Sequence, residues 1–228
     1  RLLKKPSKVD LDLSKNQERT NIPYWYPEEE FPSSLMISSS VLRIIGGNRY
    51  SNLWTKRNLY TLSKIFDEIS KISDKNLQKQ LLFGFIQSVH LSSKMCIPRE
   101  SAANRPFSTS WGRSTFIAGY KQMEMNPLMV FRGSCKGKQS VESSLKSSKE
   151  YLGGTPKLLY VDRSNKSNRS SAYDIKYGIV DISTIDDYID DGSIDFVLTD
   201  PPYGGLVQYL DLSTIWLVWL HHIDKRMK

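Results

Sequence analysis

The sequence has few of the residues that build metal sites and disulfide frameworks. It contains two cysteines, Cys96 and Cys135, and three histidines in 228 residues. The cysteines are far apart and neither belongs to a Cys-x-x-Cys pair, and the histidines do not complete a ligand set with the spacing of a zinc site. We therefore expect reduced thiols, a cytoplasmic setting and no metal.

Long apolar runs are lacking as well. No stretch reaches the ~18 apolar residues that a membrane span needs, and no secretory signal is visible. The hydrophobic content of 39% and the aromatic content of 11% are nevertheless enough for the core of one large or two small domains. The chain begins with Arg1 rather than Met, which suggests a piece of a longer protein.

Positive charge is what the sequence has in excess. It carries 32 Lys and Arg residues against 24 Asp and Glu residues, a formal net charge of +8. The excess is concentrated in residues 94–176, where 15 basic residues stand against 6 acidic ones, and the rest of the chain is almost neutral. Such a segment is typical of a solvated basic surface, but it also favours a polyanionic partner such as nucleic acid.

Two amphipathic helices are predicted in the first half of the chain. Thr55 is the expected N-cap of a helix that extends to about Ser73, with apolar residues every three or four positions at Leu59, Leu62, Ile65, Phe66, Ile69 and Ile72. Asp74 is expected to cap a second helix, whose apolar face holds Leu77, Leu81, Leu82, Phe85 and Val89. A short turn between them predicts an antiparallel pair.

Residues 1–52, ahead of this pair, are predicted to be an extended arm or linker. Apolar and acidic residues alternate from Val9 to Leu13, which fits a short edge strand. The aromatic run from Tyr24 to Tyr26 could stack on bases or anchor a loop on the core, and we favour the anchor.

Residues 53–152 are predicted to combine the helical pair with a basic insertion rich in aromatic residues. Cations and rings alternate in this insertion around Arg105, Arg113 and Arg132. Such segments bind phosphates through arginine and bases through stacking, which makes these three arginines candidate nucleic-acid-binding residues. The alternative is an irregular insertion whose rings fill the core, and the sequence leaves both open.

Residues 153–228 form the third predicted part, which begins at the turn Gly153–Gly154. A strand is expected at Leu158–Val161, and a second short strand at Ile179–Val180 ends at Asp181. Asp181 is therefore placed to cap the turn that follows it.

A third, buried strand is predicted at Ile194–Leu198, a short apolar run bounded by turn residues. Asp200 follows, and Pro201 and Pro202 end the strand because proline has no N–H to donate to a sheet. A helix is expected at residues 206–222. Its last part is apolar on all sides, which indicates burial on two sides or contact with a missing partner.

The turn Asp200-Pro201-Pro202-Tyr203 offers a carboxylate, stiff carbonyls and a flat ring. Hydrogen-bond acceptors beside an aromatic face suit a planar ligand with an exocyclic amine. The amine would donate to Asp200 and to the carbonyl of Pro201, and the ring of Tyr203 would stack on the ligand, a contact worth roughly 1–3 kcal/mol. Carboxyl ends of strands in open α/β sheets are where such ligands bind.

These four residues resemble the signature tetrapeptide of the amino-group DNA methyltransferases, which methylate adenine N6 or cytosine N4 of a flipped base with S-adenosylmethionine. The stretch from Gly178 to Asp195 is similar to the family's usual approach to the tetrapeptide. Two further stretches, Thr55–Leu59 and Tyr209–Ser213, look like a branch of DNA methylases with a long insertion before it. Relatives with Asn in place of Asp act on RNA or protein side chains, so Asp200 favours DNA.

The resemblance implies roles for single residues. It gives Asp200, Pro201, Pro202 and Tyr203 to the catalytic site and Asp181 to the adenine amine of the cofactor. The implied fold class is α/β, with part of a Rossmann-like methyltransferase sheet at the C-terminal end after a helical and irregular insertion. The implied cofactor is S-adenosylmethionine and the implied partner is DNA.

One part of the family's pattern is missing. A glycine-rich first loop of the Phe-x-Gly-x-Gly type, against which the cofactor's amino acid lies, is not found in the chain. We therefore expect an N-terminal part of the same protein or a second subunit to supply it. The alternatives are a basic nucleic-acid-binding module and an inactive remnant without its own cofactor site.

Overall fold

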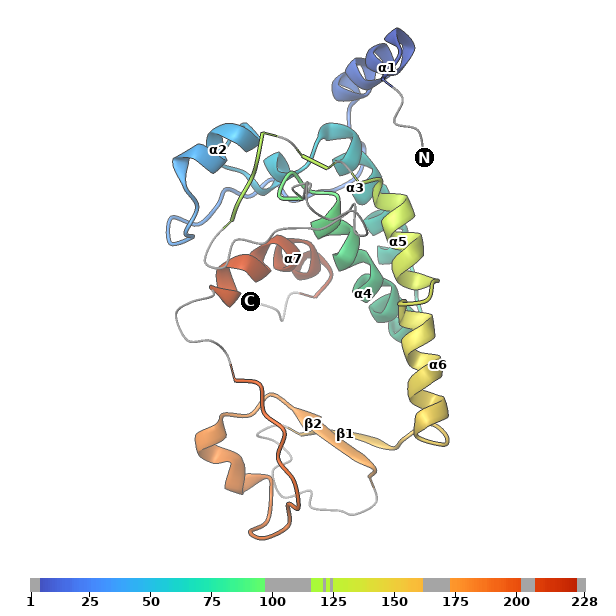
Figure 1. Ribbon diagram of the computed structural model, residues 1–228, viewed down its shortest axis with the longest axis vertical. Helices are drawn as coiled ribbons and strands as arrows, with labels where there is room; N and C mark the ends of the chain where they lie inside the picture. The colour runs from blue at the N-terminus through green and yellow to red at the C-terminus, as the bar shows by residue number, and fades with distance from the viewer. Residues whose placement is uncertain are drawn as a thin grey trace. The chain divides into compact units, whose positions relative to one another are not determined.

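The computed structural model describes residues 5–96, 116–120, 122–123, 125–161, 173–201 and 208–224 (Figure 1). Helices predominate, and a two-stranded parallel sheet accompanies them, which agrees with the predicted α/β class at its coarsest level. The chain divides into two compact units: unit 1 is Arg1–Glu142 with Tyr203–Lys228, and unit 2 is Ser143–Pro202.

Unit 1 is built from helices. In chain order they are α1 (Lys8–Arg19), α2 (Ser39–Ile45), the 3-10 helix η1 (Tyr50–Leu53), α3 (Lys56–Ser70), α4 (Lys75–Leu91), α5 (Pro127–Cys135) and α7 (Tyr209–Ile223). None of the helices in the described part of the chain combines the length and the apolar character that a membrane span needs.

The predicted helical pair is confirmed as α3 and α4. Asp74 caps α4 as expected, because its Oδ1 accepts hydrogen bonds from the backbone N–H groups of Asn76 and Leu77 at 2.9 and 3.2 Å. Thr55 stands at the N-cap of α3, but its side chain makes no capping bond and its Oγ1 is buried without a partner in the described residues. The predicted position of this N-cap is therefore confirmed, whereas the side-chain hydrogen bond expected of a capping threonine is not formed.

Gln78 fixes the turn between these two helices. Its Nε2 donates to the backbone carbonyls of Ile69, Ser70 and Ile72 at 3.0, 3.1 and 3.3 Å. These carbonyls lie at the end of α3, where no following turn of the helix provides N–H donors for them. Gln78 is buried while Leu77, predicted for the apolar face, is exposed.

The core of unit 1 is centred on Trp219 of α7. Its ring meets those of Phe66 and Phe85 at centroid distances of 5.3 Å each and that of Trp54 at 5.7 Å. The predicted helix at the C-terminal end is thus confirmed, and it packs against α4 through its buried residues. In its last apolar part, residues 215–220, Ile215 and Trp219 are buried and the other four side chains are half-buried, so the predicted burial on more than one side is seen in part.

The described part of the predicted arm 1–52, residues 5–52, contains helices and is not extended throughout. Val9–Leu13 lies within α1 rather than in an edge strand, because Ser7 and Asp10 form a capping box: Ser7 Oγ accepts from the N–H of Asp10, and the carboxylate of Asp10 accepts from the N–H of Ser7. Further along, α2 contributes Val41 and Ile45 to the core.

The aromatic run after α1 anchors its segment on the core, as we favoured. The ring of Tyr24 meets that of Tyr60 at 5.8 Å, and the ring of Trp25 meets that of Phe66 at 5.4 Å. Trp25 also meets Trp219 at 5.8 Å. These rings therefore pack against other side chains of the protein and are not free to stack on bases.

Unit 2 contains most of α6 (Val141–Tyr151), the strands β1 (Leu158–Val161) and β2 (Ile175–Gly178), and the 3-10 helix η2 (Ile182–Asp187). The strand predicted at Leu158–Val161 is confirmed. It pairs in parallel with β2, so that Tyr160 lies beside Tyr177 with ring centroids 5.5 Å apart.

The second strand begins and ends earlier than predicted. Asp174 sets its register, because its carboxylate accepts from the N–H of Lys157 at 2.7 Å and the next residue, Ile175, donates to the carbonyl of Lys157 at 3.2 Å. Pairing then ends at Gly178, opposite the last residue of β1. Ile179 is 91% exposed and is not part of a strand.

The buried strand predicted at Ile194–Leu198 is not formed. These residues belong to no strand or helix, and Phe196, Val197 and Leu198 are 79%, 72% and 89% exposed. No residue in the described part of unit 2 is buried, so this part provides no core against which an apolar strand could pack. The Rossmann-like sheet is accordingly not shown.

Candidate functional site

Asp200 and Pro201 close the irregular segment that begins at Ile194. Both are exposed, so the carboxylate of Asp200 is open to solvent rather than packed inside the protein. Pro202 and Tyr203, the other two residues of the predicted site, lie outside the described residues. The structure therefore leaves the Asp200 carboxylate accessible to a ligand.

The strands near this segment expose apolar side chains in the same way. Leu158, Tyr160, Ile175 and Tyr177 of the β1–β2 pair are all exposed. Parallel strands are normally covered on both faces. Within the described residues of unit 2, that cover is missing.

Asp181 is the N-cap of η2. Its Oδ1 accepts from the backbone N–H and the hydroxyl of Ser183, at 2.9 and 2.8 Å. These two hydrogen bonds stabilise the charged form and lower the pKa of the carboxyl. The capping role that the sequence also allowed is therefore seen. Its Oδ2 makes no hydrogen bond within the described residues and could accept one from an amine.

Arg132 lies on α5 in unit 1. Its side chain is exposed, whereas the ring of the preceding Phe131 packs against the core. In the pair Phe131–Arg132 the ring packs against the core, as in the alternative interpretation of the insertion. Only the arginine side chain is available to bind a phosphate. Arg105 and Arg113 lie outside the described residues.

Cys96 and His90 of unit 1 are buried. Burial raises the pKa of the Cys96 thiol to about 11 and lowers the pKa of His90 to about 4. Both cysteines are free thiols. Among the described residues, no group of three or more His, Cys, Asp or Glu side chains is placed to hold a metal ion.

A cavity of about 560 Å³, which was not predicted from the sequence, lies between α4 and α7 of unit 1. Its lining residues on α4 are Lys75, Gln78, Lys79, Leu82, Phe83 and Ile86, and those at the end of α7 are Leu220, Ile223 and Asp224. The sequence pattern that marks this side of α4 is Lys75, Lys79, Leu82 and Ile86, which recur at helical spacing along the edge of the core face, with Leu82 itself in the core. A single helix does not reveal what it faces, so the cavity needed the packing of α7.

A comparison with protein-family models, with curated proteins and with solved structures found no match to this chain.

Proposed function

We propose that this chain carries the base-binding segment of an S-adenosylmethionine-dependent methyltransferase that acts on the exocyclic amino group of a flipped adenine or cytosine in DNA. The observation that carries the proposal is the tetrapeptide Asp200-Pro201-Pro202-Tyr203 together with the exposure of its carboxylate. A carboxylate packed inside the protein would have no access to a base.

The roles follow from the chemistry of the four residues. Asp200 and the carbonyl of Pro201 accept the two hydrogens of the amine, which turns the nitrogen lone pair toward the methyl donor. Tyr203 stacks on the base, and Pro202 stiffens the turn between them. The enzyme needs no covalent nucleophile, because positioning and oriented acceptors activate the amine.

The methyl group comes from S-adenosylmethionine, and the chain fits that cofactor in part. The Oδ2 of Asp181, which makes no hydrogen bond in the described residues, suits the adenine amine. The glycine-rich turn for the cofactor's amino acid is absent from the sequence. We propose that an N-terminal part of the same protein or a second subunit provides it.

The exposed apolar residues of unit 2 support such a partner. Phe196, Val197 and Leu198 have the composition of a central strand but are exposed, and no strand in the described part of unit 2 pairs with them. Further parallel strands from the partner would bury them and convert the segment into the strand that the sequence predicts. The Rossmann-like sheet is then completed by the assembly.

DNA is the proposed substrate because of Asp200 and because of the charge. The net charge of +8 and exposed cations such as Arg132 favour a polyanion. Phosphate contacts would position the duplex without reading its sequence. A cytoplasmic setting suits this substrate and the two free cysteines.

The test measures transfer of labelled methyl groups from S-adenosylmethionine to duplex DNA. It uses the chain alone and the chain extended to the start of its reading frame, each with Asp200 intact or replaced by alanine. We expect Asp200→Ala to abolish transfer and to leave most DNA binding, which depends on Lys and Arg. Equal loss of transfer and DNA binding would contradict the role of Asp200. DNA binding without cofactor affinity in either form would favour the binding module instead.

A further inference from the structure

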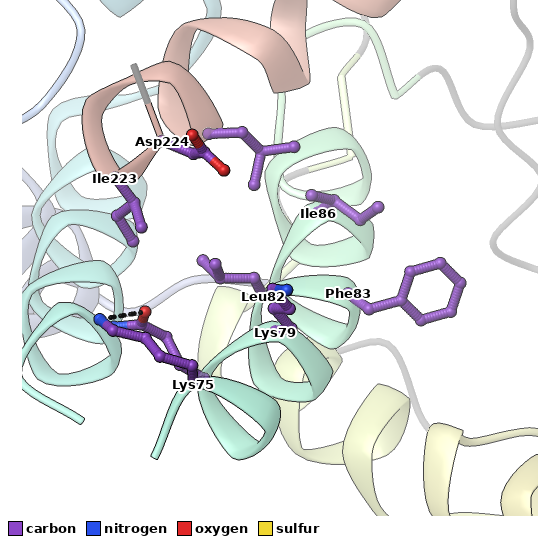
Figure 2. A pocket seen from close by; sticks show the side chains of 9 residues that line it. Lys75, Lys79, Leu82, Phe83, Ile86, Ile223 and Asp224 are labelled. Carbon is purple, nitrogen blue, oxygen red and sulfur yellow. Dashed lines mark hydrogen bonds between the residues drawn. The ribbon is translucent and has the colours of Figure 1, made fainter. Parts of the chain in front are cut away.

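The cavity between α4 and α7 has an apolar floor. Leu82 and Ile86 of α4 face Leu220 and Ile223 of α7 across it, and Figure 2 shows the labelled side chains around the opening. The two helices are held together beside the cavity, because the indole N–H of Trp216 donates to the carbonyl of Ile86 at 3.0 Å. The floor is therefore formed by packed helices of one unit.

One edge of the cavity is cationic. Lys75 and Lys79 are four residues apart on α4 and so lie on one face of the helix. The Nζ of Lys75 donates to the Oε1 of Gln78 at 3.1 Å, and Gln78 is itself fixed by three carbonyls at the end of α3. One ammonium is thus held in place before any ligand arrives, with two of its three donors remaining.

Lys79 adds a second cation that has no ion-pair partner within the described residues. The Oδ1 of Asp74, which is next to Lys75 in sequence, accepts the capping bonds from Asn76 and Leu77, and Asp74 is not among the residues that line the cavity. Asp224 stands across the cavity from both lysines (Figure 2). The acid makes that side unfavourable for an anion and leaves the α4 edge as the place where an anionic head group is attracted.

From these features we propose that the cavity binds an aliphatic monocarboxylate, with its carboxylate between the Nζ atoms of Lys75 and Lys79 and its chain on the floor of Leu82, Ile86, Leu220 and Ile223. The size fits, because small-molecule sites enclose roughly 300–1,000 Å³. An amphipathic helix of a protein partner would need a longer groove with anchors over several turns. The site belongs to unit 1 and does not depend on the proposed methyl transfer.

The experiment is isothermal titration calorimetry of the full chain with decanoate, below the concentration at which decanoate forms micelles. Hexanoate tests the apolar floor, and decylamine and decan-1-ol test the charge. We expect decanoate to bind on the order of a hundredfold more tightly than hexanoate, because it buries four further CH₂ groups on the apolar floor. Decan-1-ol should bind more weakly than decanoate, and decylamine should bind more weakly still.

Two variants test the cationic edge. K79Q and the double variant K75Q/K79Q should weaken decanoate binding, the double variant by roughly ten- to hundredfold. Both lysines are exposed, so the fold is kept, and K79Q leaves the bond between Lys75 and Gln78 intact. K64Q is the matched control, since Lys64 is an exposed lysine of α3 outside the cavity, and it should bind decanoate as the unaltered chain does.

The proposal is overturned if decanoate does not bind, if decylamine binds as well as decanoate, or if K64Q weakens binding as much as K75Q/K79Q. Chain-length independence between hexanoate and decanoate would overturn the apolar half of the site. None of these results bears on Asp200, so the two proposals fail separately.

Discussion

The ring of Trp25 stacks on the ring of His222, with centroids 3.7 Å apart and planes inclined by 18°. This contact joins the segment after α1 to the last turn of α7. Trp25 also packs edge-to-face with Trp219. Residues 219 and 222 are three apart and lie on one face of α7, which this indole ring joins to the N-terminal part of the chain.

Replacing Trp25 by alanine should therefore destabilise unit 1 by about 3 kcal/mol, the loss expected for a large aromatic residue at the core. Chemical denaturation followed by tryptophan fluorescence and circular dichroism measures it. Tyr120→Ala is the control, because this ring is 84% exposed, and its effect should stay within about 0.5 kcal/mol. Unchanged stability in Trp25→Ala with weakened DNA binding would contradict the anchoring role.

His90 should make stability depend on pH. Burial lowers its pKa from 6.5 to about 4, so between these values the unfolded chain takes up a proton that the folded chain does not. The contribution of His90 to the free energy of unfolding is therefore complete above pH 6.5 and is lost as the pH falls to about 4, by up to ~3 kcal/mol.

The difference between the unaltered chain and His90→Gln isolates this contribution from that of the carboxylates. Denaturation at several pH values from 7 to 4.5 should show a smaller loss of stability in the variant. Parallel pH profiles for the two proteins would show that His90 does not cause the dependence.

Gly84 lets α4 approach α5. A Cβ at this position would lie 2.8 Å from the Sγ of Cys135, so Gly84→Ala should destabilise unit 1 by about 1–3 kcal/mol through overpacking. Gly133→Ala on α5 is the matched control, because no atom lies within 4 Å of the added Cβ. It should be neutral or slightly stabilising, since alanine favours helix.

A double variant makes this test specific. Combining Gly84→Ala with Cys135→Ala removes the sulfur that the new methyl group meets, so the two changes should cost less together than the sum of each alone. Thermal unfolding of the four proteins provides the cycle. If the effects of the two substitutions on stability simply add, contact with the Cys135 sulfur is not the cause of the destabilisation by Gly84→Ala.

The two thiols should differ in reactivity. Cys96 is fully buried and its pKa is raised to about 11, whereas Cys135 is partly exposed with a pKa raised by burial. With an aromatic disulfide reagent at pH 8, Cys135 should react first, and Cys96 should react only as the chain unfolds. The variant Cys135→Ser assigns the phases: its remaining thiol should be the slow one, and a fast reaction there would be inconsistent with the buried position of Cys96.

The sequence predicts an element of the fold well when the residues that determine that element are close together in the chain. The spacing of Leu59, Leu62 and Phe66 predicts α3 because one helix face is read from its own residues. The start of α1 is determined equally locally, by the capping box of Ser7 and Asp10. The alternation of apolar and acidic residues from Val9 to Leu13 is also the pattern of a strand, and a strand was predicted instead of the helix.

Elements that depend on distant partners were predicted less well. Leu77 and Gln78 are neighbours, and only the carbonyls at the end of α3, which need a donor, decide that the glutamine is the buried one. Phe196 and Val197 read as a buried strand, yet a strand requires neighbours to pair with. The site shows the same division: Asp200 is recognised from four adjacent residues, while the cavity of Lys75 and Lys79 exists only because α7 packs on α4.

The most direct test of the central claim is the chemical identity of the modified base. Genomic DNA from a host that contains neither N6-methyladenine nor N4-methylcytosine would be digested to nucleosides and analysed by mass spectrometry. The host would express the protein from its complete reading frame, unaltered, with Asp200→Ala, or with Asp191→Ala as an exposed acidic control in unit 2. We predict one of the two amino-methylated bases with the unaltered protein and with Asp191→Ala, and neither with Asp200→Ala. Equal methylation with Asp200→Ala, methylation at carbon alone, or unmodified DNA from the unaltered protein would contradict the account.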